Sequence, residues 1–292
     1  MRLPPWLRKP RPHPARSRRV RDALASFGLN TVCDEALCPN RVDCLSRGTA
    51  TFMLLGDRCT RDCAFCAVEH GRPAPPDADE PARVARCVRA LGLAHAVVTS
   101  VTRDDLTDGG AGHFAATVGA VRSAAPSAGV EVLVPDFLGD ANAVETVLAS
   151  RPDVFGHNVE TAPRLYASAR PGADYRRSLA VLSQAAASGR SGHVKSALML
   201  GLGETRDEIE GVLDDLRAAG VTVVCMGQYL RPSPEHLPVA RYVPPEEFDE
   251  LRAVAEARGF ARVVAGPFVR SSYEADRVAG RTRGAGLATV AR

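Results

Sequence analysis

The segment Ala50-Thr-Phe-Met-Leu-Leu-Gly-Asp-Arg-Cys-Thr-Arg-Asp-Cys-Ala-Phe-Cys66 joins a strand pattern to three cysteines. Its first part, Thr51–Leu55, is a short apolar run of the kind that forms a buried strand. Cys59, Cys63 and Cys66 follow with the spacing CxxxCxxC. Three thiolates on one tight loop can bind three irons of a [4Fe–4S] cluster and leave the fourth iron open to a small molecule. The alternative is structural zinc, which favours four protein ligands, mostly in CxxC pairs.

Downstream of this segment, apolar runs alternate with helical patterns. The further runs are His95–Val101, Val130–Val134, Val154–Val159, Val194–Leu200 and Val221–Met226. The helical patterns are Ala82–Leu93, His113–Ala125, Ala141–Ser150, Tyr175–Ser188, Arg206–Ala219 and Pro245–Arg258. This alternation predicts an α/β fold with a parallel sheet. Six units are too few for a closed eight-stranded barrel, so we expect a partial, open (βα)6 TIM-type barrel; a doubly wound sheet is the alternative. A barrel places the cysteine loop at the C-terminal ends of the strands, where active sites lie.

Three further cysteines lie upstream of the first strand and form the first triplet in chain order. Cys33, Cys38 and Cys44 have the spacing CxxxxCxxxxxC, again without an obvious fourth ligand nearby. Two triplets with different spacings predict two clusters. The alternatives are a disulfide with a spare thiol and a cluster that only relays electrons.

Composition limits the remaining classes of function. The chain has 292 residues, 45% of them hydrophobic, and a net charge of +3. It has no run of about 18 apolar residues that could cross a membrane, and its charge does not require a nucleic-acid partner. Residues 1–21 are rich in Pro and Arg and lack the apolar core of a signal peptide, so we expect an extended basic arm and a cytoplasmic protein. The arm is either a docking segment or a solvated tail.

Several single residues also carry expectations. Asn158 and Glu160 follow the fourth apolar run, where a barrel would direct them at a bound cofactor, although such residues are also common in turns and helix caps. Lys195 lies within an apolar run and is expected to pair with a carboxylate. Cys87 and Cys225 are expected to be small core residues.

The CxxxCxxC motif with Phe65 before its last cysteine resembles that of radical S-adenosylmethionine enzymes. The resemblance implies a full or partial (βα) barrel, with the amino and carboxylate groups of S-adenosylmethionine on the open iron. It also implies that Phe65 lies beside the adenine.

Other motifs resemble the lipoyl synthase family over roughly residues 4–276. Besides the two cysteine segments they are Val98-Thr-Ser-Val-Thr-Arg-Asp-Asp-Leu-Thr-Asp-Gly-Gly110, His157-Asn-Val-Glu-Thr161, Lys195-Ser-Ala-Leu-Met-Leu-Gly-Leu-Gly-Glu204, Gly227-Gln-Tyr-Leu-Arg-Pro-Ser233 and Gly266-Pro-Phe-Val-Arg-Ser-Ser-Tyr273. The resemblance implies that a serine of the last motif completes an auxiliary [4Fe–4S] cluster on Cys33, Cys38 and Cys44. We favour Ser272 over Ser271.

The resemblance implies a domain organisation and a sulfurtransferase reaction. We expect a basic arm (1–21), an auxiliary-cluster segment (22–48), the radical barrel (49–262) and a C-terminal extension that closes the auxiliary cluster (263–292). The implied reaction inserts two sulfur atoms at C6 and C8 of an octanoyl-lysine, with the auxiliary cluster as sulfur donor. The alternatives are a biotin-synthase-like enzyme and a non-catalytic iron–sulfur carrier.

The resemblance also implies the partners. The octanoyl chain is carried by lipoyl domains of 2-oxoacid dehydrogenase E2 subunits or by the glycine cleavage H protein, and such carriers tend to be acidic. An electron donor such as flavodoxin or ferredoxin is needed, and so is an iron–sulfur carrier that repairs the consumed cluster. Neither a nucleic acid nor a membrane is expected as a partner.

Overall fold

The computed structural model describes residues 3–8, 14–46, 50–273 and 275–278 of the chain. Their eight strands form one sheet in the order β1 to β8. The strands are β1 (Asn30–Thr31), β2 (Thr51–Leu54), β3 (His95–Ser100), β4 (Gly129–Leu133), β5 (Val154–Gly156), β6 (His193–Leu200), β7 (Val223–Gln228) and β8 (Arg262–Gly266). β1 is antiparallel to β2, and every later neighbouring pair is parallel. The sheet keeps two edges, so the expected open, partial barrel is confirmed.

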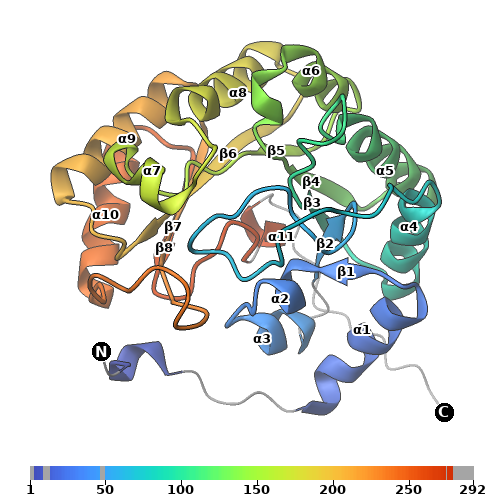
Figure 1. Cartoon of the computed structure of the whole chain (residues 1–292), viewed down its shortest axis with the longest axis horizontal. Helices are drawn as coiled ribbons and strands as arrows, with labels where there is room; N and C mark the ends of the chain where they lie inside the picture. Colours follow the sequence, from blue (N-terminus) through green and yellow to red (C-terminus); the bar gives the residue numbers. More distant parts are fainter. Residues whose placement is uncertain (1–2, 9–13, 47–49, 274, 279–292) are drawn as a thin grey trace.

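Helices cover the outside of this curved sheet (Figure 1). The outer helices are α4 (Glu80–Leu91), α5 (Ala111–Ala124), α6 (Ala141–Ala149), α8 (Tyr175–Ser188), α9 (Arg206–Ala218) and α10 (Pro245–Ala257). The remaining helices are η1 (Pro5–Leu7), α1 (Pro14–Ser26), α2 (Val32–Glu35), α3 (Arg41–Ser46), η2 (Phe137–Gly139), η3 (Pro163–Leu165), α7 (Tyr166–Ala169) and α11 (Ala275–Val278). Figure 1 shows α2 and α3 at the opening between β2 and β8. No helix in the described part of the chain is long and apolar enough to span a membrane.

Local sequence explains where the outer helices begin and end. Thr205 and Glu208 form a reciprocal capping box at the start of α9, which satisfies two backbone N–H groups that the helix itself leaves unpaired. Gly92 and Gly189 end α4 and α8 in the left-handed conformation, which glycine adopts without a Cβ clash.

Strand β2 shows how the sheet creates both a core and a site. All four of its residues are buried, as in a parallel strand covered on both faces. Phe52 and Leu54 belong to the main hydrophobic core. Thr51 and Met53 alternate with them and line a cavity inside the barrel. Lys195 is likewise buried inside the barrel, and its Nζ lies 2.8 Å from Oε1 of Glu131, the carboxylate partner that the sequence could not identify.

The structure extends the sequence expectations at both ends of the barrel. The six predicted strands correspond to β2–β7, and the six predicted helices correspond to the outer ring. Strands β1 and β8 were not expected, because β1 has only two residues and β8 follows directly on α10. The expected barrel ends at residue 262, whereas β8 begins at this residue and continues the barrel to Gly266.

The expected basic arm is helical at its C-terminal end. α1 runs through the expected boundary at residue 21 and contributes the buried Val20 and Leu24 to the core. These two side chains attach the helix to the barrel, so that part of the arm is not extended. Residues 1–2 and 9–13 of the arm, and 274 and 279–292 of the C-terminal extension, lie outside the described residues.

Candidate active site

The CxxxCxxC loop follows β2 at the C-terminal end of the barrel, as expected. The Cys59 Sγ accepts hydrogen bonds from the backbone N–H groups of Arg61 (3.4 Å) and Thr102 (3.3 Å). The Ala64 N–H donates to the carbonyl of Ala169 after β5, and the Leu237 N–H, after β7, donates to the carbonyl of Ala64. Loops from three different strands therefore hold the cysteine loop in place.

A cavity of about 470 Å³ lies inside the barrel next to this loop. It brings together nearly all of the site residues expected from sequence. Those that line it are Cys33, Cys38, Cys59, Cys63, Phe65, Cys66, Asn158, Glu160, Ser271 and Ser272. Cys33 and Cys38 of the upstream triplet and all three cysteines of the CxxxCxxC motif, which are separate in the sequence, thus line the same cavity.

A smaller pocket of about 30 Å³ gathers the first triplet. Cys33, Cys38 and Cys44 line it together with Ser272 and Arg270. Ser272 lines both cavities, whereas Ser271 lines only the larger one. This placement favours Ser272 as the residue that completes the ligand set.

Long-range contacts bring the C-terminal tail to this pocket. Asn40 Nδ2 donates to the carbonyl oxygen of Phe268 (2.6 Å), and the Tyr273 hydroxyl lies 3.2 Å from Oδ2 of Asp43. A Cβ built on Gly227 would lie 2.0 Å from the Val269 carbonyl oxygen, so glycine at this point of β7 leaves the space that the tail occupies.

Burial controls the protonation of the thiols. It raises the pKa of Cys33 and of Cys66 to about 12, and the pKa of Cys63 to about 11. Repulsion between like charges within each triplet also raises these pKa values. Cys38 and Cys44 raise the pKa of Cys33. Cys59 raises the pKa values of Cys63 and Cys66. Metal binding to such thiols is coupled to the release of their protons.

The donor set fits iron–sulfur clusters. Among the described residues, no three His, Cys, Asp or Glu side chains are grouped as the ligands of a single metal ion would be. The thiols instead line two adjoining cavities that share Cys33 and Cys38, and a [4Fe–4S] cluster takes each thiolate on a different iron. Three thiols on the CxxxCxxC loop, and three thiols with Ser272 in the smaller pocket, match the ligand sets of two such clusters.

A polar group lies on the wall formed by the end of β5. Asn158 Nδ2 donates to Oε1 of Glu160 (3.0 Å), and Glu160 has a left-handed backbone with φ of 66°. Among the described residues, the buried Asn158 Oδ1 has no hydrogen-bond partner. The N-cap of the following η3 is Ala162, so neither residue caps that helix. An unpaired polar atom beside a strained backbone is typical of a ligand site.

Arg170 completes this group, and sequence reasoning missed it. Its Nη1 donates to the carbonyl of Asn158 (3.0 Å), while its buried Nε has no partner among the described residues. Burial raises the pKa of Glu160, and the positive charge of Arg170 opposes that effect. Arg170 ends the short helix α7 outside any quoted motif, so no local signal in the sequence identifies it.

Comparisons with known proteins agree with this geometry. Residues 53–216 match the family model described as the radical SAM superfamily. The lipoyl synthase of Methylococcus capsulatus is 54% identical over 280 residues, which cover 96% of this chain and 87% of that protein. The lipoyl synthase of Trichlorobacter lovleyi is 54% identical over 275 residues, covering 94% of this chain and 97% of that protein.

Solved structures with low identity share the fold. Streptococcus suis SuiB bound to the precursor peptide SuiA superposes with a TM-score of 0.58 at 10% identity, over 85% of this chain and 52% of SuiB. TYW1 with a lysine–pyruvate adduct gives a TM-score of 0.53 at 11% identity, over 82% of this chain and 89% of TYW1.

Proposed function

The chain belongs to the lipoyl synthase family of radical S-adenosylmethionine enzymes, and from this premise we propose how its residues divide the reaction. The enzyme is a sulfurtransferase whose cofactors are S-adenosylmethionine and [4Fe–4S] clusters. It inserts two sulfur atoms at C6 and C8 of an octanoyl group linked to a lysine of a lipoyl carrier protein. These carbons carry unactivated C–H bonds, which no acid or base side chain can ionise, so a cofactor must perform the difficult step.

Cys59, Cys63 and Cys66 hold the cluster that meets S-adenosylmethionine. Cys33, Cys38, Cys44 and Ser272 hold the auxiliary cluster. When bound, the two clusters supply the electron that cleaves S-adenosylmethionine and the sulfide that is inserted. The observation that carries this assignment is the single cavity lined by cysteines of both triplets, Cys33 and Cys38 of one and all three of the other, because hydrogen abstraction and sulfur insertion must occur at the same carbon.

The other cavity residues position the reactants. Arg170 offers a buried cation for a carboxylate, and Asn158 and Glu160 offer hydrogen-bonding groups for the methionine part or the ribose. Phe65 lines the same cavity and provides a face for the adenine. Apolar side chains such as Met53 and Leu133 line the space in which the acyl chain would lie. Such a lining excludes water from a reactive radical and holds the carbon in position.

The wider setting of the enzyme is part of the proposal. The acyl carriers are E2 lipoyl domains or the glycine cleavage H protein, a flavodoxin or ferredoxin supplies electrons, and an iron–sulfur carrier restores the auxiliary cluster. The cytoplasm is the compartment that suits this chemistry, because all eight cysteines are free thiols and reducing conditions keep them so. Residues 22–48 and the tail after β8 serve the auxiliary cluster, and the barrel between them serves the radical cluster.

The test separates the two cysteine triplets. Replacing Cys33, Cys38 and Cys44 with Ala should leave about four irons per chain. Because the radical cluster remains, S-adenosylmethionine should still yield deoxyadenosine, but no sulfur should reach an octanoylated carrier peptide. Replacing Cys59, Cys63 and Cys66 with Ala should also leave about four irons and should abolish deoxyadenosine formation.

Iron analysis, deoxyadenosine yield and peptide mass spectrometry check these outcomes under anaerobic, reducing conditions. Cys87→Ala is the matched control, because Cys87 is buried in α4 and lines neither cavity. Lipoyl formation by the first triple variant would refute the sulfur-donor assignment. A wild-type protein that binds its clusters but never cleaves S-adenosylmethionine would instead support an iron–sulfur carrier.

A further inference from the structure

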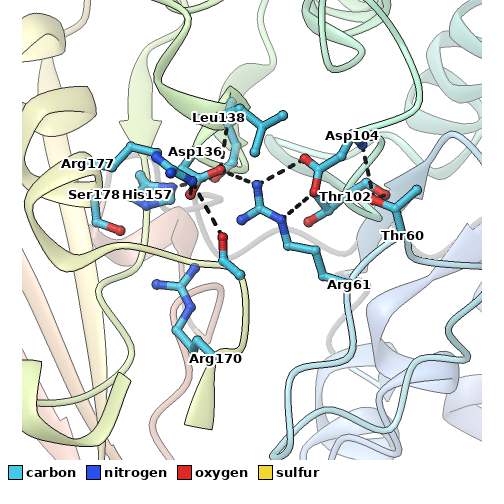
Figure 2. A network of polar contacts seen from close by, with 12 residues as sticks. Thr60, Arg61, Thr102, Asp104, Asp136, Leu138, His157, Arg170, Arg177 and Ser178 are labelled. Atoms are coloured by element: carbon cyan, nitrogen blue, oxygen red, sulfur yellow. Dashed lines mark hydrogen bonds and ion pairs between the residues drawn. The ribbon is translucent and has the colours of Figure 1, made fainter. Parts of the chain in front are cut away.

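Arg61 lies between two cysteines of the radical-cluster loop, yet it does not line the cavity. Its side chain lies instead in a network of polar contacts with residues that follow β3 and β4 (Figure 2). Only 7% of this side chain is exposed. Its Nε and Nη2 donate to the two carboxylate oxygens of Asp104, at 2.7 and 2.9 Å. The same Nη2 also donates to Oδ1 of Asp136 at 2.6 Å. One guanidinium therefore joins the cysteine loop to the ends of β3 and β4.

Thr60 continues this connection along the backbone. Its N–H and its hydroxyl both donate to the carbonyl of Thr102, each at 3.0 Å. The Asp104 N–H in turn donates to the Thr60 hydroxyl oxygen at 3.0 Å. Residues 60–61 and 102–104 thus form a continuous clamp, and the Arg61–Asp104 ion pair closes its outer end.

The clamp presents two N–H groups to one sulfur. The backbone N–H groups of Arg61 and Thr102 point at the Cys59 Sγ from the two sides of the clamp. Hydrogen bonds to a cluster sulfur stabilise the more negative, reduced state and thereby raise the reduction potential. Both donors lie on segments whose separation depends on the Arg61–Asp104 pair.

We propose that Arg61 is a positioning residue for reduction of the radical cluster: its bridge across Asp104 and Asp136 holds two backbone N–H groups on the Cys59 sulfur and so raises the potential of that cluster. The inference rests on the proposed role of Cys59 as an iron ligand. The step concerned is a one-electron reduction, supplied by dithionite in the test below, in which no bond forms or breaks at Arg61.

The geometry explains why arginine serves here and lysine would not. A guanidinium is planar and presents two parallel N–H bonds to one carboxylate while a further N–H meets a second carboxylate. Asp136 is fully buried and also receives Arg177 Nη1 at 3.2 Å and the Leu138 N–H at 3.2 Å, so its position is determined independently of Arg61. A lysine ammonium has its three N–H donors on a single nitrogen, so it cannot match the forked geometry of these three hydrogen bonds.

The test isolates the radical cluster by using the Cys33, Cys38, Cys44→Ala chain as background. Arg61→Gln in this background should still bind about four irons. Its midpoint potential, from a dithionite titration followed by electron paramagnetic resonance, should be more negative than that of the background chain. Deoxyadenosine formation at a fixed, limiting dithionite concentration should fall on the order of 10- to 100-fold, the usual cost of losing support around a metal site. The midpoint potential of Arg61→Lys should lie between that of the background chain and that of Arg61→Gln.

Two further variants make the result decisive. Arg177→Gln removes another partner of Asp136 without touching the loop and should leave the potential unchanged. Asp104→Asn keeps the size of the side chain but removes the charge that pairs with Arg61, so it should loosen the clamp and shift the potential in the same direction even if Arg61→Gln binds no cluster. An unchanged potential in an iron-loaded Arg61→Gln chain, or in Asp104→Asn, overturns the inference. Failure of the background chain to bind iron would instead refute the ligand assignment of the proposed function.

Discussion

His157 illustrates how far burial alters a single residue in this barrel. It follows β5, its side chain is buried, and its Nδ1 lies 2.8 Å from the carbonyl oxygen of Val134. Burial, with the positive charge of Arg170, lowers the pKa of His157 from 6.5 to about 4. The imidazole is therefore neutral in the folded protein at neutral pH, and its Nδ1–H donates a hydrogen bond to the Val134 carbonyl.

This shift predicts a pH dependence of stability. The unfolded chain takes up a proton at His157 near pH 6.5, whereas the folded chain does so only near pH 4. The free energy of unfolding therefore falls as the pH is lowered from 6.5 to 4, by about 2 kcal/mol at pH 5. His157→Gln keeps a donor for Val134 and should reduce this loss. Urea unfolding of the iron-free chain at pH 7 and pH 5 measures the difference; an equal loss in both proteins would contradict the assignment.

At the scale of elements, the C-terminal tail is the segment that unites the two ends of the chain. It leaves β8, crosses β7 where Gly227 gives it room, and contacts the cysteine segment through Asn40 and Tyr273. α11 then lies near β3. These contacts join residues more than 200 positions apart. The smaller pocket, which holds Cys33, Cys38 and Cys44, therefore forms only when the barrel is folded.

The tail carries the prediction on the fourth ligand. Ser272→Ala should bind less auxiliary iron and form little lipoyl product, because the serine oxygen is lost from the pocket of the first triplet. Ser271→Ala is the matched control: Ser271 is the adjacent residue and lines only the larger cavity. Ser272→Cys should keep the iron but slow sulfur transfer, because a thiolate binds iron more firmly than an alkoxide. Iron retention against a chelator and peptide mass spectrometry check these outcomes. A normal Ser272→Ala variant with an inactive Ser271→Ala variant would reverse the assignment.

For the whole molecule, an open barrel creates the space that a closed one lacks. Eight parallel strands in a closed barrel fill their interior with side chains. Here seven parallel strands leave an opening, which the N-terminal segment with α2 and α3 and the C-terminal tail occupy (Figure 1). Cysteines of both triplets line the cavity that remains. The incomplete sheet is therefore the feature that would allow the two proposed clusters and the substrate chain to meet.

The basic N-terminal region carries the prediction on carrier docking. Arg18, Arg19 and Arg21 are exposed on α1, whereas Val20 and Leu24 hold that helix against the core. Deletion of residues 1–20 would therefore disturb packing as well as charge. Replacing the three arginines with Gln should raise the apparent KM for an acidic octanoylated carrier severalfold at low salt and leave a short octanoylated peptide unaffected. Equal changes in KM for both substrates would indicate a solvated helix with no docking role.

The amino-acid pattern alone determined the features that depend on local order. The spacing of apolar residues predicts six of the strands and the outer helices. A helix buried on one face repeats its apolar residues every three to four positions, and a strand buried on both faces is a short continuous apolar run. The spacings of Cys59, Cys63 and Cys66, and of the upstream triplet, predict the cluster ligands, because thiols that are close together in the chain can reach one cluster. Lys195 signals a buried ion pair, because an ammonium within an apolar strand needs a partner.

Only the tertiary structure decided which distant residues meet. It identifies Glu131 as the partner of Lys195, adds Arg170 to the polar group of Asn158 and Glu160 at the end of β5, and connects Arg61 to Asp136. It also adds β1 and β8 and places Ser272 in the pocket of the first triplet. These contacts depend on the order and curvature of the sheet, which bring strand ends and tails together regardless of their separation in the chain. The periodicity of apolar residues within one element carries no information about contacts between distant segments. The chemistry of the individual residues could therefore be predicted, while their pairing could not.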